Sequence, residues 1–226
     1  MPIIAVCLAM ALTAPPPPEV AWQDLFNGKN LDGWVVEGPT MDKTGKPMWA
    51  VENGAITVLG KGYGFLRYEK KEYTDFTYRV EYRFEAGGKG NSGLGIRTVP
   101  YDPKDATLSR PSYASFEIQL LDDAGKPAND HGSASLYRYK GPTANKVKPG
   151  PEWNTIEVTC VGPKVTIVMN GEKVLEANHA ELPELKNRPK GVAEVKDKPV
   201  RGYVSLQSHG GRVEFRKVQI RELPAK

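Results

Sequence analysis

The stretch that decides the fold class is TDFTYRVEYRF, residues 74–84. Every second side chain in it is apolar or aromatic, and the side chains between them are polar or charged. A period of two is typical of a β-strand that buries one face and leaves the other in water. The buried face is predicted to consist of Phe76, Tyr78, Val80, Tyr82 and Phe84.

The same alternation recurs along the chain, and two Asn-Gly turns join neighbouring segments. Asn53-Gly54 and Asn170-Gly171 are each flanked by alternating apolar runs, the pattern of a tight antiparallel hairpin. We expect roughly ten to twelve antiparallel strands, packed as two sheets or closed as a barrel. One short helical turn is expected near residues 180–185. Further strands are predicted at residues 94–99, 115–121, 155–161, 165–169, 203–208 and 213–220.

Composition excludes several classes of protein. The chain has 226 residues, with 31 Lys and Arg against 27 Asp and Glu, which gives a net charge of +4. That length suits a single all-β domain. The charge is small and spread out, so nucleic acid is not an expected partner. No apolar run reaches about 18 residues, so no membrane span is expected.

The N-terminus carries a short apolar run, residues 3–14, that ends at four prolines. Such a run is typical of the hydrophobic part of a secretory signal. We therefore assign residues 1–14 to a signal peptide, residues 15–21 to a linker and residues 22–223 to one domain, and expect a secreted or periplasmic protein. The positive charge that usually opens a signal is missing, so a disordered leader or a misplaced start codon is the alternative.

Cys160 would be the only cysteine left once the leader is removed. It lies in an alternating segment, which favours a buried structural thiol over a nucleophile. The sequence has neither a disulfide framework nor zinc-ligand spacing, so no residue is assigned to a metal and no cofactor is required.

Three predicted strands place small or polar residues on the face that does not enter the core. If Leu94 and Ile96 point into the core, Arg97 shares the opposite face with Gly93 and Gly95. Two glycines there leave room for a ligand to lie flat on the sheet. The same alternation in the other two strands adds Glu117, Gln119, Gln207 and His209 to this face.

Together these side chains supply a carboxylate, an imidazole, a guanidinium and two amides. Such a set suits recognition of vicinal hydroxyls, as in a carbohydrate, and proton transfer at a polar ligand. The alternative is that each residue is an ordinary solvent-facing group on an antiparallel sheet.

Polar residues also gather after the strand that carries Glu117. Their oxygens are of the kind that Ca²⁺ prefers, so a divalent cation is one interpretation, and a simple turn at residues 123–127 is another. His131 is interpreted as a second base or a loop cap, and Tyr137 and Tyr139 as an aromatic wall for a sugar or as packing residues. The oxygen-bearing residues are Asp122, Asp123, Asn129 and Asp130.

Two long polar loops complete the pattern, at residues 100–112 and 181–201. Loops of that length in a compact domain are usually functional or mobile. The second is rich in Lys and Arg, so it is interpreted as a solvated loop or as a charged lid.

Blocks of the sequence resemble, in order, those of the 3-keto-disaccharide hydrolase domain family. The opening block is LFNGKNLDGW, residues 25–34. Each block alone is weak, but the ordered set is specific and covers about residues 22–223. The later blocks are NSGLGIR at 91–97, EIQLLD at 117–122, WN at 153–154, NG at 170–171, GYVSLQSHG at 202–210 and VEFRKVQIREL at 213–223.

The resemblance implies a concanavalin A-like fold, that is, an all-β, two-sheet antiparallel jelly-roll sandwich, usually in secreted or periplasmic bacterial proteins. It also implies action on glycosides whose sugar is oxidised to a ketone at C3. One departure is Ser208, where many members have an Asp before the following His. The groove residues that carry over are Arg97, Glu117, Gln119, Gln207 and His209.

The implied chemistry is reasonable on physical grounds. A C3 ketone acidifies the proton on C2; its removal lets the C1 substituent leave by β-elimination, and water can add back for net hydrolysis. Glu117 or His209 is expected to be the base, and Arg97 or a bound cation the partner of the enolate oxygen. A non-catalytic carbohydrate-binding module on the same scaffold is the alternative. The residues expected to bind substrate are Gln119, Gln207, His131 and Tyr137.

Overall fold

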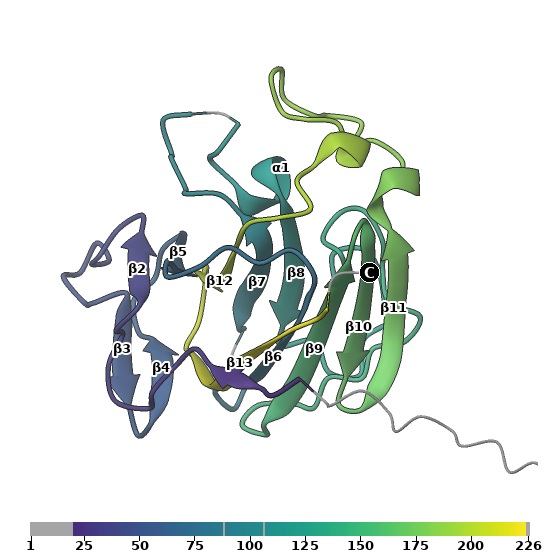
Figure 1. The fold of residues 1–226 in the computed structure, drawn as a ribbon. Helices are drawn as coiled ribbons and strands as arrows, with labels where there is room; N and C mark the ends of the chain where they lie inside the picture. The colour runs from purple at the N-terminus through teal and green to yellow at the C-terminus, as the bar shows by residue number, and fades with distance from the viewer. Residues whose placement is uncertain (1–19, 88, 106, 225–226) are drawn as a thin grey trace, which may run out of the picture.

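The structure is a computed structural model that describes residues 20–87, 89–105 and 107–224. These residues form two antiparallel β-sheets with very little helix (Figure 1). The two-sheet antiparallel sandwich expected from the sequence is confirmed. The signal peptide assigned to residues 1–14 lies outside the described residues.

The larger sheet has eight strands. Its order is β11 (Glu172–Asn178), β10 (Lys164–Met169), β9 (Asn154–Val161), β6 (Phe76–Phe84), β13 (Val213–Glu222), β4 (Ala55–Val58) and β3 (Trp49–Glu52), and β1 (Gln23–Asp24) pairs with β13.

The smaller sheet has five strands. Its order is β2 (Trp34–Glu37), β5 (Gly64–Tyr68), β12 (Tyr203–Ser208), β7 (Asn91–Thr98) and β8 (Phe116–Leu121). The short strands β1, β2 and β5 bring the number of described strands above the expected range. The helical turns are α1 (Pro111–Ala114), η1 (His179–Glu181) and η2 (Val195–Asp197). No helix between residues 20 and 224 is long and apolar enough to cross a membrane.

Both Asn-Gly turns close hairpins, as predicted. Asn53 and Gly54 have φ values of 51° and 73°, and Asn170 and Gly171 have values of 50° and 86°. Two successive positive φ values define the hairpin turn that matches the twist of the flanking strands. Local sequence therefore fixes the β3–β4 and β10–β11 pairings.

The core lies between the sheets and follows the predicted alternation of β6. Its five apolar and aromatic residues are buried, whereas Arg79, Glu81 and Arg83 on the other face are only partly buried. Cys160 is also buried in the core, and burial raises the pKa of its thiol to about 12. The interpretation of this cysteine as a structural residue is consistent with that environment.

The outer edge of β8 is covered by a segment of turns, residues 133–137, that forms an isolated bridge between Leu136 and Ile118. Gln119 donates its backbone N–H to Ser135 O at 3.1 Å and accepts from Ala134 N at 2.8 Å, and Tyr137 N donates to Glu117 O at 2.9 Å. Further along, the Ser133 hydroxyl bonds both backbone groups of Leu121. This segment occupies the edge of the smaller sheet.

Candidate active site

A pocket lies over the five-stranded sheet, on the face opposite the core. Phe116, Ile118 and Leu120 point into the core, so the alternation of β8 turns Glu117 and Gln119 to the other face. The structure brings five of the predicted residues together here and adds four that were not predicted. The pocket is lined by Tyr63, Asn91, Arg110, Ser112, Glu117, Gln119, Tyr137, Gln207 and His209.

Glu117 forms the floor of the pocket and is only 6% exposed. Gln207 Nε2 donates a hydrogen bond to its Oε1 at 2.7 Å. Burial raises the pKa of Glu117 to about 7, against the opposing effects of this hydrogen bond and of the positive charge of Arg110. Near neutral pH the protonated and ionised forms of Glu117 are therefore both populated, as a general base or acid requires.

The amides beside Glu117 have unused hydrogen-bonding capacity. The side-chain oxygens of Gln119 and Gln207 are buried and have no hydrogen-bond partner among the described residues. Buried polar atoms in folded proteins are normally paired. These two acceptors are therefore suited to the hydroxyl groups of a ligand or to bound water.

The two glycines of β7 serve a different purpose from the one expected. A Cβ on Gly93 would lie 2.9 Å from Glu117 Oε1, and a Cβ on Gly95 would lie 2.2 Å from Ser205 Oγ. The prediction that they leave room for a flat ligand is wrong, because the side chains of Glu117 and Ser205 take that room. The glycines instead allow the pocket floor to be built.

We expect Gly95→Ala to lower the free energy of unfolding by about 1–3 kcal/mol, the usual cost of forcing a methyl group into a packed site. The new Cβ would also lie 2.6 Å from Thr98 Cγ2, so two neighbours would have to move. Denaturant unfolding measures the change. Gly210→Ala is the matched control, since a Cβ there meets no atom within 4 Å. Equal effects of the two variants would contradict this account.

Arg97 does not reach the pocket, and this placement corrects the sequence prediction. The pairing of β7 with β12 shifts between Tyr203 and Val204, which leaves Arg97 as the extra residue of a β-bulge with φ of 54°. A bulge interrupts the two-residue alternation. Thr98 therefore returns to the face of Gly95, and the side chain of Arg97 turns to the other side.

The guanidinium of Arg97 is fully buried away from the pocket. Its Nη2 donates to Thr74 O at 2.8 Å and lies 3.8 Å from Asp75 Oδ1. Burial lowers the pKa of Arg97 from its ordinary value. Arg97 is therefore placed to stabilise the chain around residues 74–75 and not to contact a ligand on the pocket floor.

Arg110 supplies the guanidinium that was expected from Arg97. It is exposed, lines the pocket, and lies in the loop of residues 100–112 that length alone marked as functional or mobile. Its charge acts on its neighbours, since it lowers the pKa of both Glu117 and His209. A loop residue has no periodicity to reveal which way it points, so the sequence could not single it out.

Tyr63 is the second residue that the sequence analysis missed. Its ring makes edge contacts with Phe65, Tyr101 and His209, at centroid distances of 5.2, 6.3 and 5.6 Å. Burial and the neighbouring charge of Glu117 raise the pKa of the Tyr63 hydroxyl well above its usual value, so it keeps its proton and remains a donor. Flanking Gly62 and Gly64 were the only sequence signal.

His209 lies at the rim of the pocket and is exposed. Desolvation and the charge of Arg110 lower the pKa of its imidazole, so the neutral form is favoured near neutral pH. A neutral imidazole can accept a proton or a hydrogen bond, but it is a poor acid under those conditions.

Tyr137 lines the pocket, and His131 lies behind it. The two rings meet edge to face at 5.1 Å, and His131 Nδ1 is 2.7 Å from Asp130 Oδ1. His131 is exposed and does not line the pocket, so it can act on a ligand there only through Tyr137. Tyr139 packs instead against Phe116, at 5.8 Å.

The acidic residues after β8 do not converge. Asp123 is buried and accepts from Ser133 N, and Asp130 faces His131. Within residues 20–224, as far as they are described, no three His, Cys, Asp or Glu residues are grouped to hold a metal ion. The interpretation as a Ca²⁺ site stays a prediction.

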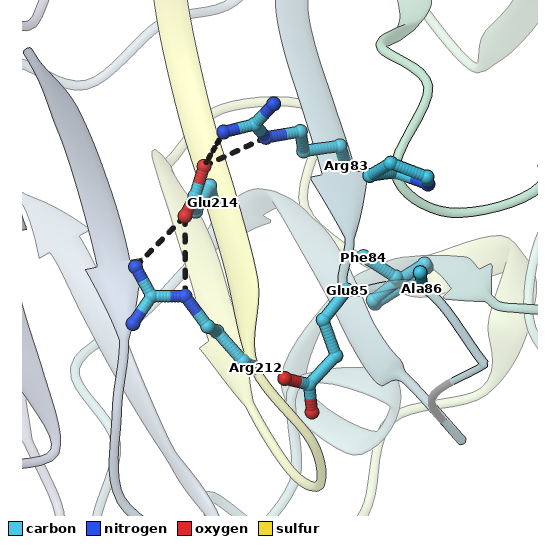
Figure 2. Close-up of a pocket in the computed structure, with 7 residues that line it drawn as sticks. Arg83, Phe84, Glu85, Ala86, Arg212 and Glu214 are labelled. Atoms are coloured by element: carbon cyan, nitrogen blue, oxygen red, sulfur yellow. Dashed lines mark hydrogen bonds and ion pairs between the residues drawn. The ribbon is translucent and has the colours of Figure 1, made fainter. Parts of the chain in front are cut away.

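A larger hollow of about 220 Å³ lies on the outer face of the eight-stranded sheet. Figure 2 shows Glu214 held between Arg83 and Arg212, with ion-pair distances of 2.7 and 2.8 Å. Arg212 also pairs with Glu52 at 2.7 Å. Since these charges neutralise one another, this hollow is a weaker candidate than the pocket with the buried, unneutralised Glu117.

Similar structures share the sandwich. A protein from Parabacteroides distasonis, provisionally assigned as a glycosyl hydrolase, is 27% identical with a TM-score of 0.68, over 90% of this chain and 94% of that one. The carbohydrate-binding module CBM66 from Bacillus subtilis has a TM-score of 0.54 at 12% identity, over 84% and 96% of the two chains, and so supports the fold alone.

Sequence comparison identifies the family. A curated protein of Bacteroides thetaiotaomicron named 3-keto-disaccharide hydrolase is 26% identical, over 88% of this chain and 77% of its own length. The pattern that defines the 3-keto-alpha-glucoside-1,2-lyase-like domain matches residues 21–221, nearly the whole chain. The protein therefore belongs to the 3-keto-alpha-glucoside-1,2-lyase-like domain family.

Proposed function

We propose that the protein is a carbohydrate-active enzyme that cleaves 3-keto-glycosides by removing the proton on C2 and eliminating the C1 substituent. The observation that carries the proposal is Glu117, a buried carboxyl group with a pKa near 7 on the floor of a pocket lined by hydrogen-bonding groups. Family membership and the name of the Bacteroides relative support this substrate class.

Glu117 is the base in this scheme. Its ionised form takes the C2 proton, and the electron pair of the broken C–H bond moves into an enolate on the C3 oxygen. Arg110 and the protonated hydroxyl of Tyr63 are the donors for that oxygen, in the role that Arg97 was expected to fill. Preorganised donors aimed at a developing negative charge are usually the largest single contribution to such catalysis.

Collapse of the enolate re-forms the C3 ketone and breaks the bond between C1 and the glycosidic oxygen. This leaves a double bond between C1 and C2 of the sugar. The departing oxygen needs a proton, and protonated Glu117 or a water molecule can supply it. Water then adds its hydroxyl group to C1, and the proton that the water loses goes to C2, which completes a net hydrolysis. We infer that neutral His209 at the exposed rim accepts this proton from the water before it passes to C2.

The size of the pocket limits how a substrate binds. Its free space is about 50 Å³, so we expect only one edge of a sugar ring to enter and the rest of the glycoside to lie at the rim. The unused acceptors of Gln119 and Gln207 suit hydroxyl groups on that edge. The rings of Tyr137 and His209 also line the pocket.

The test is release of an aglycone from a 3-keto-glucoside, compared with the matched glucoside that lacks the ketone. We expect release from the keto sugar alone, since only its C2 proton is acidic. Binding of both sugars without release would favour the carbohydrate-binding module. Cleavage of the unoxidised glucoside would contradict the elimination chemistry.

The rate should depend on the ionisation of Glu117. Below pH 7 we expect kcat/KM to fall about tenfold per pH unit, because the base must be deprotonated. Gln207→Met should move this acid limb to higher pH, since the Gln207 amide lowers the pKa of Glu117. Gln219→Met is the control, because Gln219 also donates to a carboxylate, Asp24, on the other sheet. An acid limb that Gln207→Met leaves in place would argue against Glu117 as the base.

We also propose that the protein is exported and that residues 1–14 are removed on the way. The apolar run before the four prolines motivates this proposal. Expression in a bacterium, followed by the mass of the protein in the periplasm and medium, tests it. Full-length protein confined to the cytoplasm would contradict it.

A further inference from the structure

Lys198 is a buried cation that the proposed chemistry does not use. It follows η2 in the basic loop of residues 181–201 and is only 3% exposed. In Figure 1 this loop arches over the same end of the sandwich as α1. The sequence was interpreted as a solvated loop or a charged lid here, and neither predicts a buried lysine, so Lys198 needs a physical reason.

The ammonium of Lys198 binds the turn that leads into the active site. Its Nζ donates to the backbone oxygens of Ser112 and Ser115, both at 2.6 Å. It also lies over the rings of Phe116 and Tyr139, at 4.8 and 4.9 Å from their centroids. Carbonyl groups at the end of a helical turn lack internal partners, and a lysine can supply them.

The turn held in this way connects two parts of the pocket. Arg110 comes directly before α1, and Glu117 comes two residues after Ser115. Within the turn, Tyr113 N and Ala114 N donate to Arg110 O at 3.0 and 3.4 Å. A single ammonium therefore holds the short segment whose two ends carry the base and the cation.

We propose that Lys198 is a positioning residue whose ammonium clasps the α1 turn and so holds Arg110 over Glu117, an inference that rests on the proposed function. It touches no substrate. Its effect is exerted through the backbone of residues 110–116.

Several other charged or titratable groups face Lys198. Glu184 raises the pKa of Lys198, and Arg138 lowers it. Glu184 is itself paired with Arg188 at 3.2 Å, and the buried ring of His179 has its own pKa lowered in part by Lys198. From the element of Lys198 itself, Lys196 is exposed and pairs with Glu194.

Protonation of Lys198 is expected to control the clasp. Burial, the largest effect, lowers its pKa to about 7, whereas a lysine in an unfolded chain has a pKa of about 10.4. Between those values the unfolded chain binds a proton that the folded chain lacks, so this group raises global stability as pH rises. The charge-assisted hydrogen bonds of the folded chain weaken as pH rises through about 7, where Lys198 loses its proton. Activity should thus fall above pH 7 without a loss of stability.

The test combines hydrogen exchange with a pH profile. In Lys198→Met we expect the amides of Tyr113 and Ala114 to exchange about tenfold faster than in the wild type at pH 6, in line with the loss of a charged hydrogen bond. With a 3-keto-glucoside, the wild type should show rising and falling limbs of kcat/KM around pH 7. Lys198→Met should keep the rising limb at a reduced level and lose the falling one.

Two further variants complete the design. Lys198→Arg, which stays charged at all relevant pH values, should keep activity at alkaline pH. Lys196→Met, which removes an exposed lysine two residues away, should change neither exchange nor profile.

Two results would overturn the positioning role of Lys198. One is unchanged amide exchange rates of Tyr113 and Ala114 in Lys198→Met, and the other is a falling limb of kcat/KM that persists in this variant. A wild-type protein that does not act on the keto sugar, but shows the exchange difference, would overturn the proposed function and leave the clasp standing.

Discussion

Glu117→Gln is expected to reduce turnover of a 3-keto-glucoside by roughly 10²–10⁴-fold, the usual contribution of a general base. Substrate binding should change little, because Gln preserves the shape of the side chain and can still bond Gln207. Binding is measured by calorimetry with the non-reactive unoxidised glucoside or with the keto sugar and the inactive variant. A variant that keeps more than a small fraction of wild-type activity would remove Glu117 from the role of base.

The same substitution should stabilise the folded protein at alkaline pH. The pKa of Glu117 is raised from 4.5 to about 7, so the folded chain binds this proton more tightly than the unfolded chain does. The stability that the proton confers is present below pH 4.5 and is lost as pH rises through 7. Above that range the ionised carboxylate lowers the free energy of unfolding by about 3 kcal/mol, and an uncharged Gln side chain does not have this effect.

Thermal unfolding at pH 5 and pH 8 measures this effect. We expect Glu117→Gln to raise Tm at pH 8 more than at pH 5. Glu157→Gln is the matched control, since Glu157 is paired with Arg79 at 2.9 Å on the outer face of the other sheet. A higher Tm in both variants, or in neither, would contradict the assignment of a buried, destabilised carboxylate.

Arg110→Met is expected to lower kcat by about 10²–10³-fold, the range for removal of one group that stabilises a developing oxyanion. It should also move the acid limb to higher pH, because the charge of Arg110 lowers the pKa of Glu117. Steady-state kinetics across the pH range measures both effects, and Arg110→Lys should restore part of the rate.

Lys104→Met is the control for Arg110, since Lys104 is an exposed cation of the same loop that does not line the pocket. If the two variants behaved alike, the effect of Arg110 would be one of general charge and not of position.

The fold could be predicted from sequence because its signals are local. The alternation of residues 74–84 assigned one face of β6 to the core, and two Asn-Gly pairs placed two hairpins. The polar face was also predicted well where alternation is unbroken: Glu117, Gln119 and Gln207 all reach the pocket. Alternation failed at Arg97, where one extra residue in the strand reversed the direction of the side chain.

The remainder of the site depends on tertiary contacts, which leave no periodic signal. Arg110 and Tyr63 belong to loops, and their directions are set by the elements against which they pack. Lys198 looked like one of many solvated cations, and only the fold shows that it is enclosed by Phe116, Tyr139 and two carbonyl groups. Long loops could be marked as functional, but not the residues in them.

The segment that covers the edge of β8 bears on what kind of molecule can be selected. A sheet with an open edge can recognise an extended peptide by adding it as one more strand. Here the backbone groups of Gln119 and Leu121 are already used by residues 133–135. A ligand above Glu117 therefore cannot be bound as an additional strand at this edge, which disfavours an extended peptide and leaves hydroxyl-rich molecules as the better match.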